Sequence, residues 1–357
     1  MKPFVVSIPL GGFNRSGGVK TLVLLANAMA ARGWQIRIIV PDYAAQTPFY
    51  LDASVSLEQL RTSALPLTIR KIIYYVRLAV EAAKGADLCL ANYYLTAYCA
   101  LVSKALNWKA RIVYFVQGDE AVSHGRLAQA NWLSRLLRSS LAKVSYRLPV
   151  SVICVSYWLK ARIGRPDGVV VTQGLDLDTF RPSARRSFAT SPMVIGTVGS
   201  LAEGKGYQHF CRAVTLLPDR SGLEVLVAAN EEVAMPSGVV GKRVSPRNEA
   251  EMAEFYNHCD IFVCASLSEG FGLPPLEAMA CGCAVVTTEC GGVTDFSKHE
   301  TNCLMVSPGD PEDLAEAIER LLHDRNLCRR LADEGINTGR QFDRTRMVAQ
   351  FLDVLAA

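Results

Sequence analysis

Two glutamates, Glu269 and Glu277, stand on either side of a turn rich in glycine and proline, in the segment SEGFGLPPLEAMACG at residues 268–282. A carboxylate can accept paired hydrogen bonds from neighbouring hydroxyl groups, and the free N–H groups at the start of a helix bind phosphate. Gly270 and Gly272 would let the backbone approach such a ligand closely. Together these residues indicate a ligand that carries both hydroxyl groups and phosphate.

A structural interpretation of the same glutamates stays open. We expect Pro275 to begin a helix, because its missing N–H costs nothing in the first helical turn. Glu277 would then lie in that first turn and offset the helix dipole, and Glu269 would form a capping pair with Ser266. This interpretation is favoured for either glutamate taken alone. The ligand interpretation is favoured for both glutamates and the turn taken together.

The elements that position these residues follow from the alternation of strand and helix signals along the chain. The predicted strands are continuous apolar runs, which are typical of strands buried on both faces of a parallel sheet. They occupy residues 4–9, 36–40, 87–92, 111–116, 151–156 and 169–174, and then 193–200, 223–229, 260–266 and 284–289. The helices expected in the first half lie near residues 18–33, 69–84, 94–106 and 130–147.

The domain organisation follows from a polar segment near the middle of the chain. Residues 181–192 contain two prolines and show no periodicity, so we interpret them as a linker. We therefore predict an α/β fold with two Rossmann-like, doubly wound domains, over residues 1–182 and 191–340. A C-terminal helix in residues 341–357 is expected to cross back to the first domain. Ligands bind beyond the carboxyl ends of such strands, and a deep cleft between the domains is the expected site.

Composition and cysteine usage exclude several classes of protein. No stretch of about 18 uncharged apolar residues is present, so no membrane-spanning helix is expected, and the apolar run before Pro9 is too short for a signal peptide. The eleven cysteines lie in apolar runs, which favours free thiols in a reducing cytoplasm. Cys281, Cys283 and Cys290 lack a matching pair of metal ligands, and the D-x-D triplet at residues 176–178 is interpreted as a turn cap. We expect neither a metal nor another cofactor.

The two halves of the chain differ strongly in charge. Residues 1–185 carry 23 basic and 10 acidic residues, and the remainder carries 15 basic and 24 acidic residues. Between Glu120 and Asp167 there is no acidic residue, although eight basic residues lie there. The first half is therefore expected to present a positive surface to an anionic partner. Nucleic acid is not expected, because no nucleic-acid-binding motif accompanies the charge.

An amphipathic helix is predicted within this acid-free region, at residues 129–148. Its apolar face carries Leu133, Leu137, Leu141, Val144 and Leu148, and its basic residues are Arg135, Arg138, Lys143 and Arg147. Such a helix could lie on an anionic membrane. The helix alone favours a packed domain helix with a solvated basic face. The acid-free surroundings favour proximity to the inner face of the plasma membrane or an anionic glycolipid acceptor.

Several segments, taken in order, resemble one known family. The two glutamates resemble the E-x7-E signature of the retaining glycosyltransferases of family 4, which have the GT-B fold. Further similarity lies in SGGVKTLVLLANAMAARGWQIRIIV, CVSYWLKARIG, VVTQGLDLDTFRP, VIGTVGSLAEGKGYQHFCRAV and NCLMVSPGDPEDLAEAIERLL. The resemblance covers most of the chain and is weakest over residues 41–110.

This resemblance implies roles for individual residues. Glu277 would hold the ribose hydroxyls of the nucleotide, Glu269 would contact the transferred sugar, and Lys205 would neutralise the departing diphosphate. Glu269 and Lys205 are therefore the candidate catalytic residues. The other candidate donor-binding residues are Gly17, Gly18, Ser200, Gly270, Phe271, Gly272, Leu273, Arg243 and Val244. A hydrogen-bond donor placed where negative charge develops on the leaving group lowers the activation barrier of the transfer by about 3 kcal/mol.

The chain departs from the family pattern at two positions. Ser200 stands where the family usually has an arginine for the diphosphate, and Lys20 or Arg15 could compensate for the lost charge. Gln117 stands where the family often has a histidine that orients the sugar, and a glutamine there is similar to some rhamnosyltransferases. Asp119 and Glu120 follow, either as contacts for acceptor hydroxyls or as loop residues without such a role.

The function implied by the resemblance is the transfer of a hexose or deoxyhexose, with retention and without a metal. The donor would be a nucleotide sugar, and the acceptor a glycan or lipid-linked glycan of bacterial lipopolysaccharide, O-antigen or another surface polysaccharide. Glu269 could be a nucleophile, but we favour attack from the same face, in which the acceptor proton passes to the departing phosphate. The alternatives are a non-catalytic nucleotide-sugar-binding protein and a nucleotide-sugar epimerase of the same fold.

Overall fold

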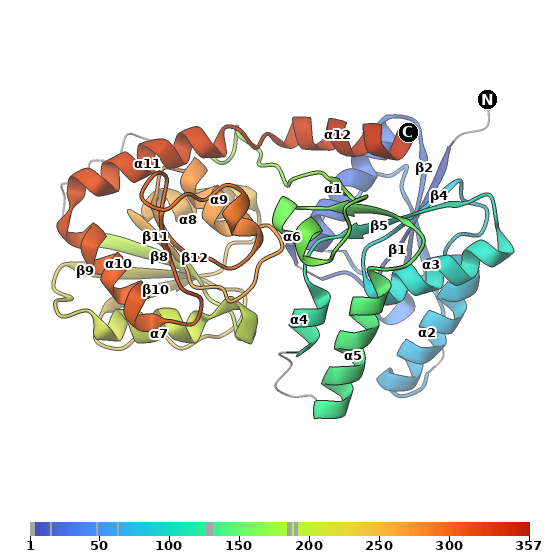
Figure 1. Ribbon diagram of the computed structural model, residues 1–357, viewed down its shortest axis with the longest axis horizontal. Coiled ribbons are helices and arrows are strands. Elements are labelled where there is room, and N and C mark those ends of the chain that lie inside the picture. The colour runs from blue at the N-terminus through green and yellow to red at the C-terminus, as the bar shows by residue number, and fades with distance from the viewer. Residues whose placement is uncertain are drawn as a thin grey trace. The chain divides into compact units, whose positions relative to one another are not determined.

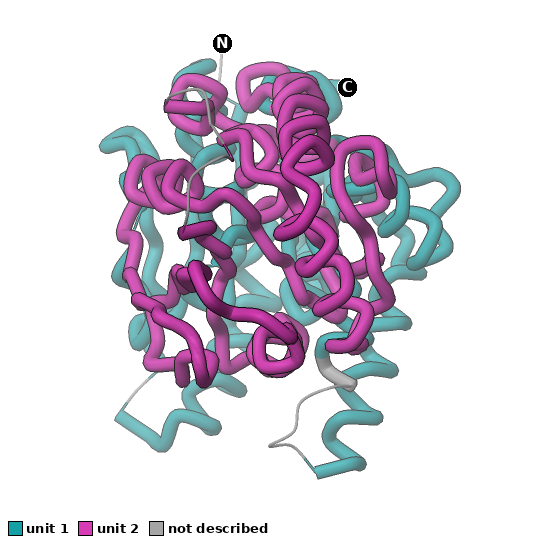
Figure 2. The backbone as a smooth tube through the Cα atoms, turned by 90° about the vertical axis from the view of Figure 1, so that its left-hand side faces the viewer, with its two compact units in different colours: residues 1–171, 348–357 teal, residues 172–347 magenta. Residues whose placement is uncertain are grey.

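The computed structural model describes residues 4–14, 16–47, 49–62, 64–125, 131–183, 188 and 192–357. It divides into two compact units, Met1–Val171 with Val348–Ala357, and Thr172–Met347. Figure 2 shows the two units in different colours. The first unit thus ends eleven residues before the predicted limit of 182, because Leu175 hydrogen-bonds to the backbone of Phe342 and Arg344 in the second unit. Part of the expected linker, residues 184–187 and 189–191, lies outside the described residues.

The first unit contains a sheet of seven parallel strands in the order β3-β2-β1-β4-β5-β6-β7. The strands are β1 (Val5–Pro9), β2 (Gln35–Pro41), β3 (Ser56–Leu60), β4 (Leu88–Ala91), β5 (Arg111–Val116), β6 (Ser151–Cys154) and β7 (Val169–Val170). The helices are α1 (Gly17–Ala31), α2 (Leu67–Glu81), α3 (Tyr94–Leu106), α4 (Glu120–Gly125), α5 (Trp132–Ser145) and α6 (Tyr157–Arg162). The strand order reverses between β1 and β4, which is where such sheets bind ligands.

The second unit repeats this plan with six parallel strands in the order β10-β9-β8-β11-β12-β13. The strands are β8 (Met193–Val198), β9 (Leu223–Ala228), β10 (Val240–Val244), β11 (Ile261–Cys264), β12 (Ala284–Thr288) and β13 (Leu304–Val306). The helices are α7 (Tyr207–Leu216), α8 (Glu249–His258), α9 (Leu273–Ala280), α10 (Pro311–His323) and α11 (Arg325–Gly339). Here the order reverses between β8 and β11. The last helix, α12 (Arg344–Ala356), begins in the second unit and ends in the first (Figure 1).

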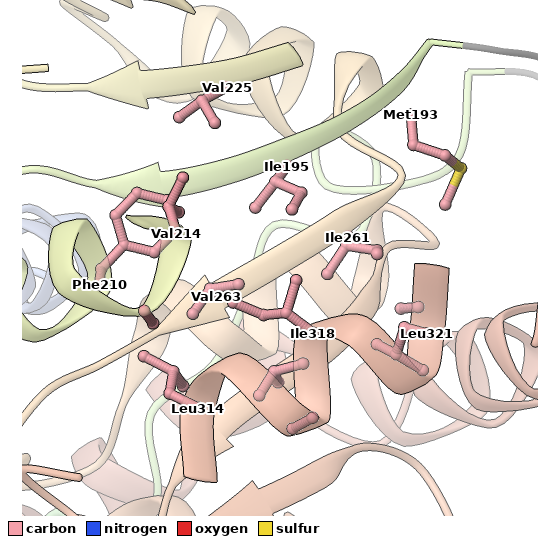
Figure 3. Packing of buried hydrophobic residues seen from close by; sticks show 14 of the residues in the cluster. Met193, Ile195, Phe210, Val214, Val225, Ile261, Val263, Leu314, Ile318 and Leu321 are labelled. Carbon is pink, nitrogen blue, oxygen red and sulfur yellow. The ribbon is translucent and has the colours of Figure 1, made fainter. Parts of the chain in front are cut away.

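The core of the second unit forms because its strands carry apolar side chains on the face that α7 and α10 cover. Ile195, Ile261 and Val263 from neighbouring strands lie close to Phe210 of α7 and Ile318 of α10 (Figure 3). These side chains are almost completely buried. Burial of such side chains is the main favourable contribution to folding, and here it holds β8 and β11 side by side.

Three strands, β3, β10 and β13, were not predicted from the sequence. β3 and β10 are edge strands whose residues are mostly exposed or half-buried, and β13 has only three residues. β3 and β10 therefore lack the continuous apolar run that marks a strand buried on both faces, and the apolar run of β13 is too short to indicate one. The helix expected to begin at Pro275 begins at Leu273 instead, with Gly272 as its N-cap. In the part of the chain that the structure describes, no helix is both long and apolar enough to cross a membrane.

Candidate functional site

Lys205 and Glu269 form an ion pair at the point where the strand order of the second sheet reverses. Lys205 follows β8 and Glu269 follows β11, and Lys205 Nζ lies 2.7 Å from Glu269 Oε1. The two loops are joined by a hydrogen bond of 2.8 Å from the Leu267 N–H to the Gly204 carbonyl. The Glu269 carboxylate raises the pKa of Lys205, so the ammonium group remains charged. The lysine side chain is 43% exposed, which leaves it accessible to a ligand.

The backbone and side chain of Glu269 are held from several directions. Ser266 Oγ donates to Glu269 Oε1 at 2.8 Å, and the Thr288 hydroxyl donates to the Ser266 carbonyl. The Glu269 N–H donates to the Cys290 carbonyl, and its own carbonyl accepts from the Gly292 N–H. The expected contact between Ser266 and Glu269 is therefore present. This support fixes one carboxylate and one ammonium group at the carboxyl edge of the sheet.

Glu277 lies in the second turn of α9, since the helix begins at Leu273 and has no acidic residue in its first turn. The expectation that Glu277 offsets the dipole from the first turn is therefore wrong. Its side chain is largely buried, and Tyr256 donates a hydrogen bond of 2.8 Å to Glu277 Oε2. Burial, followed by the nearby Glu277 carboxylate, raises the pKa of Tyr256 well above its usual range, so this phenol stays protonated. Tyr256 is a residue that the sequence analysis missed.

Gly206 permits the close approach of the loops after β8 and β11. Its φ is +61°, and a Cβ atom there would lie 2.0 Å from the Ala265 carbonyl oxygen. Both the left-handed conformation and the lack of space favour glycine. This glycine immediately follows Lys205, so it also sets the position of the ammonium group.

A substitution at Gly206 is expected to destabilise the second unit. Gly206→Ala should lower the free energy of unfolding by about 2 kcal/mol, because the methyl group must push the Ala265 backbone away. Gly204→Ala is the matched control, since a Cβ there would meet no atom within 4 Å. We expect urea denaturation to show a change below about 0.5 kcal/mol for this control. Equal stability of the two variants would refute the role given to Gly206.

The other predicted donor residues of the second unit fall into two groups. Gly270, Phe271, Gly272 and Leu273 lead into α9, and the Phe271 ring is buried against the rings of Phe296 and Phe342. This places the Phe271 side chain in the core of the second unit. Arg243 and Val244 lie on the edge strand β10, two strands away from β8.

Ser200 follows β8 and binds a carboxylate of its own unit. Its hydroxyl donates to Glu231 Oε1 at 2.8 Å, and the Leu201 N–H donates to the same oxygen at 2.6 Å. Arg243 donates to the Glu231 carbonyl at 2.9 Å. Glu231, which sequence reasoning missed, thus adds negative charge where the family pattern would have an arginine. Of the two residues expected to compensate, Lys20 lies in the first turn of α1, and Arg15 lies outside the described residues.

In the first unit, Gly17 and Gly18 begin α1, with Ser16 as the N-cap. Gln117 follows β5 and donates from Nε2 to the Gly18 carbonyl at 3.3 Å. A Cβ on Gly18 would lie 3.1 Å from Gln117 Oε1, so a larger residue would crowd this contact. The structure therefore brings the glycine loop and Gln117 together at the carboxyl edge of the first sheet.

Asp119 and Glu120 are both engaged within the first unit. Arg162 Nε lies 3.0 Å from Asp119 Oδ2. Glu120 accepts a hydrogen bond of 2.9 Å from the Tyr94 N–H and one of 3.3 Å from the Tyr114 hydroxyl. These contacts favour the interpretation of both residues as supports of the loop. Burial raises the pKa of Glu120 to about 8, although the Tyr94 N–H favours its charged form.

The raised pKa of Glu120 predicts a pH dependence of stability. The unfolded chain releases this proton near pH 4.5 and the folded chain near pH 8, so stability is lost as pH rises between these values. Glu120→Gln keeps an acceptor oxygen and removes the titration. The free energy of unfolding of the wild type should therefore fall by about 3 kcal/mol more than that of the variant between pH 5 and pH 8. Parallel urea titration curves for both proteins would contradict the assignment.

Metal ligands do not cluster among the residues that the structure describes. Across residues 4–183 and 192–357, apart from Arg15, Pro48, Ser63 and residues 126–130, no group of three His, Cys, Asp or Glu side chains could hold a metal ion. Cys281, Cys283 and Cys290 are buried and carry reduced side chains. The basic residues Arg135, Arg138 and Lys143 lie on α5, and Arg147 follows that helix.

Comparison with known proteins relates each unit to a glycosyltransferase family. The family described as "Glycosyltransferase Family 4" matches residues 15–179, and that described as "Glycosyl transferases group 1" matches residues 192–324. The chain is 34% identical over 186 residues to D-inositol 3-phosphate glycosyltransferase of Corynebacterium jeikeium, covering 44% of each protein. It is 31% identical over 158 residues to N,N'-diacetylbacillosaminyl-diphospho-undecaprenol alpha-1,3-N-acetylgalactosaminyltransferase of Campylobacter jejuni, covering 42% of this chain and 40% of the relative. The chain thus spans less than half the length of these two relatives.

A solved structure extends the likeness to the whole chain. Sucrose-phosphate synthase of Thermosynechococcus elongatus is similar with a TM-score of 0.78 and 20% sequence identity, and the match covers 99% of this chain and 98% of that one. At this identity the likeness concerns the fold. Two parallel, doubly wound sheets and matches to both families agree with the predicted architecture. The chain therefore has the GT-B fold of the group 1 and family 4 glycosyltransferases.

Proposed function

We propose that the chain is a retaining, metal-independent glycosyltransferase, which transfers a hexose or deoxyhexose from a nucleoside diphosphate sugar to a glycan or glycolipid. The observation that carries this proposal is the ion pair of Lys205 and Glu269, held at the switch point of the second sheet next to the turn into α9. The ammonium group and the backbone N–H groups of the glycine turn can bind the phosphates of such a donor, and the carboxylate can accept hydrogen bonds from its hydroxyl groups. Glu277, on the same helix, is assigned to the ribose hydroxyls.

In the proposed reaction the bond between the anomeric carbon and the diphosphate oxygen breaks while the acceptor oxygen bonds to the same face of the sugar. The acceptor hydroxyl passes its proton to the departing diphosphate, so no side-chain base is required. Lys205 stabilises the negative charge that develops on the diphosphate. Glu269 positions the sugar through its hydroxyl groups and keeps Lys205 protonated.

The proposed acceptor is a lipid-linked glycan of bacterial surface polysaccharide synthesis, such as lipopolysaccharide or O-antigen. The Campylobacter jejuni relative is named as a transferase that acts on a diphospho-undecaprenol glycan. In this chain we assign acceptor binding to the first unit, where Gln117 would orient the sugar next to the glycine loop. A glutamine at this position favours a deoxyhexose such as rhamnose as the sugar that is transferred from the donor.

A product assay tests this function. The purified chain would be incubated with UDP-, GDP- and dTDP-sugars, a chelator and lipid-linked glycans from bacterial membranes. We expect release of one nucleoside diphosphate only when acceptor is present, and a product whose anomeric configuration, determined by NMR, matches that of the donor. Inversion of configuration would overturn the retaining mechanism. Tight nucleotide binding without any product would instead favour a non-catalytic nucleotide-sugar-binding protein.

The non-catalytic alternative has one observation in its favour. Ser200 and the Leu201 N–H bind the Glu231 carboxylate, so this side of the loop carries negative charge where a diphosphate would need positive charge. Weak stabilisation of the leaving group would lower the rate of sugar transfer more than the affinity for the donor. The intact pair of Lys205 and Glu269 favours the enzyme.

Glu231 is expected to weaken donor binding. Glu231→Gln keeps an acceptor for the Ser200 hydroxyl and removes the charge, and it should tighten nucleoside diphosphate binding by roughly fivefold in calorimetric titration. Glu232→Gln, at the neighbouring exposed position, is the matched control and should change affinity by less than about twofold. Equal effects of the two substitutions would show that Glu231 acts only through net charge.

A further inference from the structure

We propose that the first unit binds the anionic surface of a phospholipid bilayer through the exposed sides of α2, α3 and α5, which we call the α2–α3–α5 surface. This inference does not depend on the proposed transferase activity. It rests on exposed apolar side chains, on their arrangement over neighbouring helices and on the charge around them.

Helix α2 carries an apolar stripe that faces solvent. Ile69, Ile72, Val76 and Val80 follow the three- and four-residue spacing of one helical face, and all four are exposed. Ile72 is 60% exposed and Val76 is 65% exposed. Only Tyr74 and Leu78 of this helix are buried. A helix of a soluble domain buries its apolar face, so this stripe requires a partner.

Helix α5 shows the same property. The sequence analysis left open whether Leu133, Leu137, Leu141, Val144 and Leu148 pack into the domain or face a membrane. The first four are exposed and Leu148 is half-buried. Trp132 and Leu136 are exposed as well, whereas the buried residues of the helix are Ala142 and Ser145. The exposure of these side chains favours the membrane interpretation of this apolar face. Tryptophan prefers the boundary between water and lipid, which fits the exposure of Trp132 at the start of α5.

Helix α3 lies between these two helices and joins their surfaces. It packs against both α2 and α5, and its Val102 and Leu106 are exposed, as is Trp108 after its end. The crossovers from β3 to β4, β4 to β5 and β5 to β6 all run in one direction along the sheet, which places these helices on one face. Figure 1 shows α2 and α5 extending toward the bottom of the view, beyond the strands of the first unit. The apolar side chains can therefore meet one extended partner.

Charge identifies that partner as anionic. The three helices contain seven basic residues and one acidic residue, Glu81 at the end of α2. The basic residues are Arg70, Lys71, Arg77, Lys104, Arg135, Arg138 and Lys143. Arg70 is paired with Asp42, so the other six residues supply the positive charge of this surface. Basic residues beside exposed apolar and tryptophan side chains match a bilayer with anionic headgroups, whereas a second copy of this surface would bring like charges together.

Vesicle co-sedimentation of the full chain tests this proposal. The probe is a vesicle of phosphatidylcholine with phosphatidylglycerol, compared with phosphatidylcholine alone. The double variant Ile72→Glu/Val76→Glu introduces charge into the α2 stripe at exposed positions, where folding does not depend on burial. Val240→Glu is the matched control, because Val240 is an exposed apolar residue, 75% accessible, on β10 of the second unit. Arg135→Gln/Arg138→Gln tests the basic contribution from α5.

We expect the wild type and Val240→Glu to bind anionic vesicles and to bind less at high salt. The α2 double variant should lose binding by about tenfold or more, since two apolar side chains can no longer enter the lipid. The α5 variant should lose most of the salt-dependent part of binding. The tryptophan fluorescence of the wild type, to which the exposed Trp108 and Trp132 contribute, should shift to the blue only with anionic vesicles. Equal binding by the α2 variant and Val240→Glu would overturn the proposal. A dimer in sedimentation that only the α2 variant dissociates would also overturn it.

Discussion

Lys205→Ala is expected to lower the turnover of the nucleotide sugar by about a hundredfold or more, with the fold intact. Lys205 supplies the positive charge at the switch point of the second sheet, and its Glu269 partner keeps it protonated. Removal of the ammonium group leaves the developing charge of the diphosphate without its main partner. The loss should appear in kcat, because the interaction strengthens as the leaving group departs. Steady-state kinetics with a soluble acceptor would measure it.

Two controls separate this effect from a general loss of charge. Lys298→Ala removes an exposed lysine of the same unit and should leave kcat within about twofold. Glu269→Gln keeps the size and shape of the side chain but removes the carboxylate that raises the pKa of Lys205, and it should therefore lower kcat. Because the amide also binds the sugar hydroxyls less well than a carboxylate, the variant should raise KM as well. If Lys205→Ala turned over substrate at the wild-type rate, the proposed role of this lysine would be lost.

Glu277→Ala is expected to weaken nucleoside diphosphate binding by about a hundredfold, because two hydrogen bonds from ribose hydroxyls to a carboxylate are lost. The same change leaves the buried Tyr256 hydroxyl without its Glu277 partner, which should cost about 2 kcal/mol of stability. Calorimetric titration with the nucleotide and urea denaturation measure the two effects separately.

Tyr256→Phe distinguishes the binding role of Glu277 from its structural role. This variant removes the hydroxyl that donates to Glu277 and keeps the carboxylate. It should lose about 1 kcal/mol of stability and keep nucleotide affinity within about threefold. Equal losses of affinity in Tyr256→Phe and Glu277→Ala would mean that Glu277 serves only the packing of α9.

The central strands could be predicted from sequence because burial on both faces leaves a continuous apolar run, as in β5 and β11. The edge strands β3 and β10 could not, since solvent on their outer side removes that signal. The start of α9 was placed two residues late, because a proline is tolerated throughout the first turn and therefore does not mark its first residue. Secondary structure was thus predictable where burial decides the residue type.

For the site, residue types were predictable and their pairing was not. Lys205 and Glu269 lie 64 residues apart, and only the order of β8 and β11 in the sheet brings them together. Tyr256 and Glu231 carry no motif, since they act through contacts with Glu277 and Ser200 that depend on tertiary structure. The exposed stripe of α2 was missed for a related reason. An amphipathic helix has the same spacing of apolar residues whether its apolar face packs on the sheet or contacts a bilayer.

The most direct test of the donor site is a thermal-shift series with UDP, GDP and dTDP and their sugars, in the presence of a chelator. One nucleotide series should raise the melting temperature of the wild type by several degrees at about a hundred times its dissociation constant. The same series should leave Glu277→Ala nearly unchanged. A wild type that no nucleoside diphosphate or nucleotide sugar stabilises would contradict the account of Lys205, Glu269 and Glu277 as a donor site.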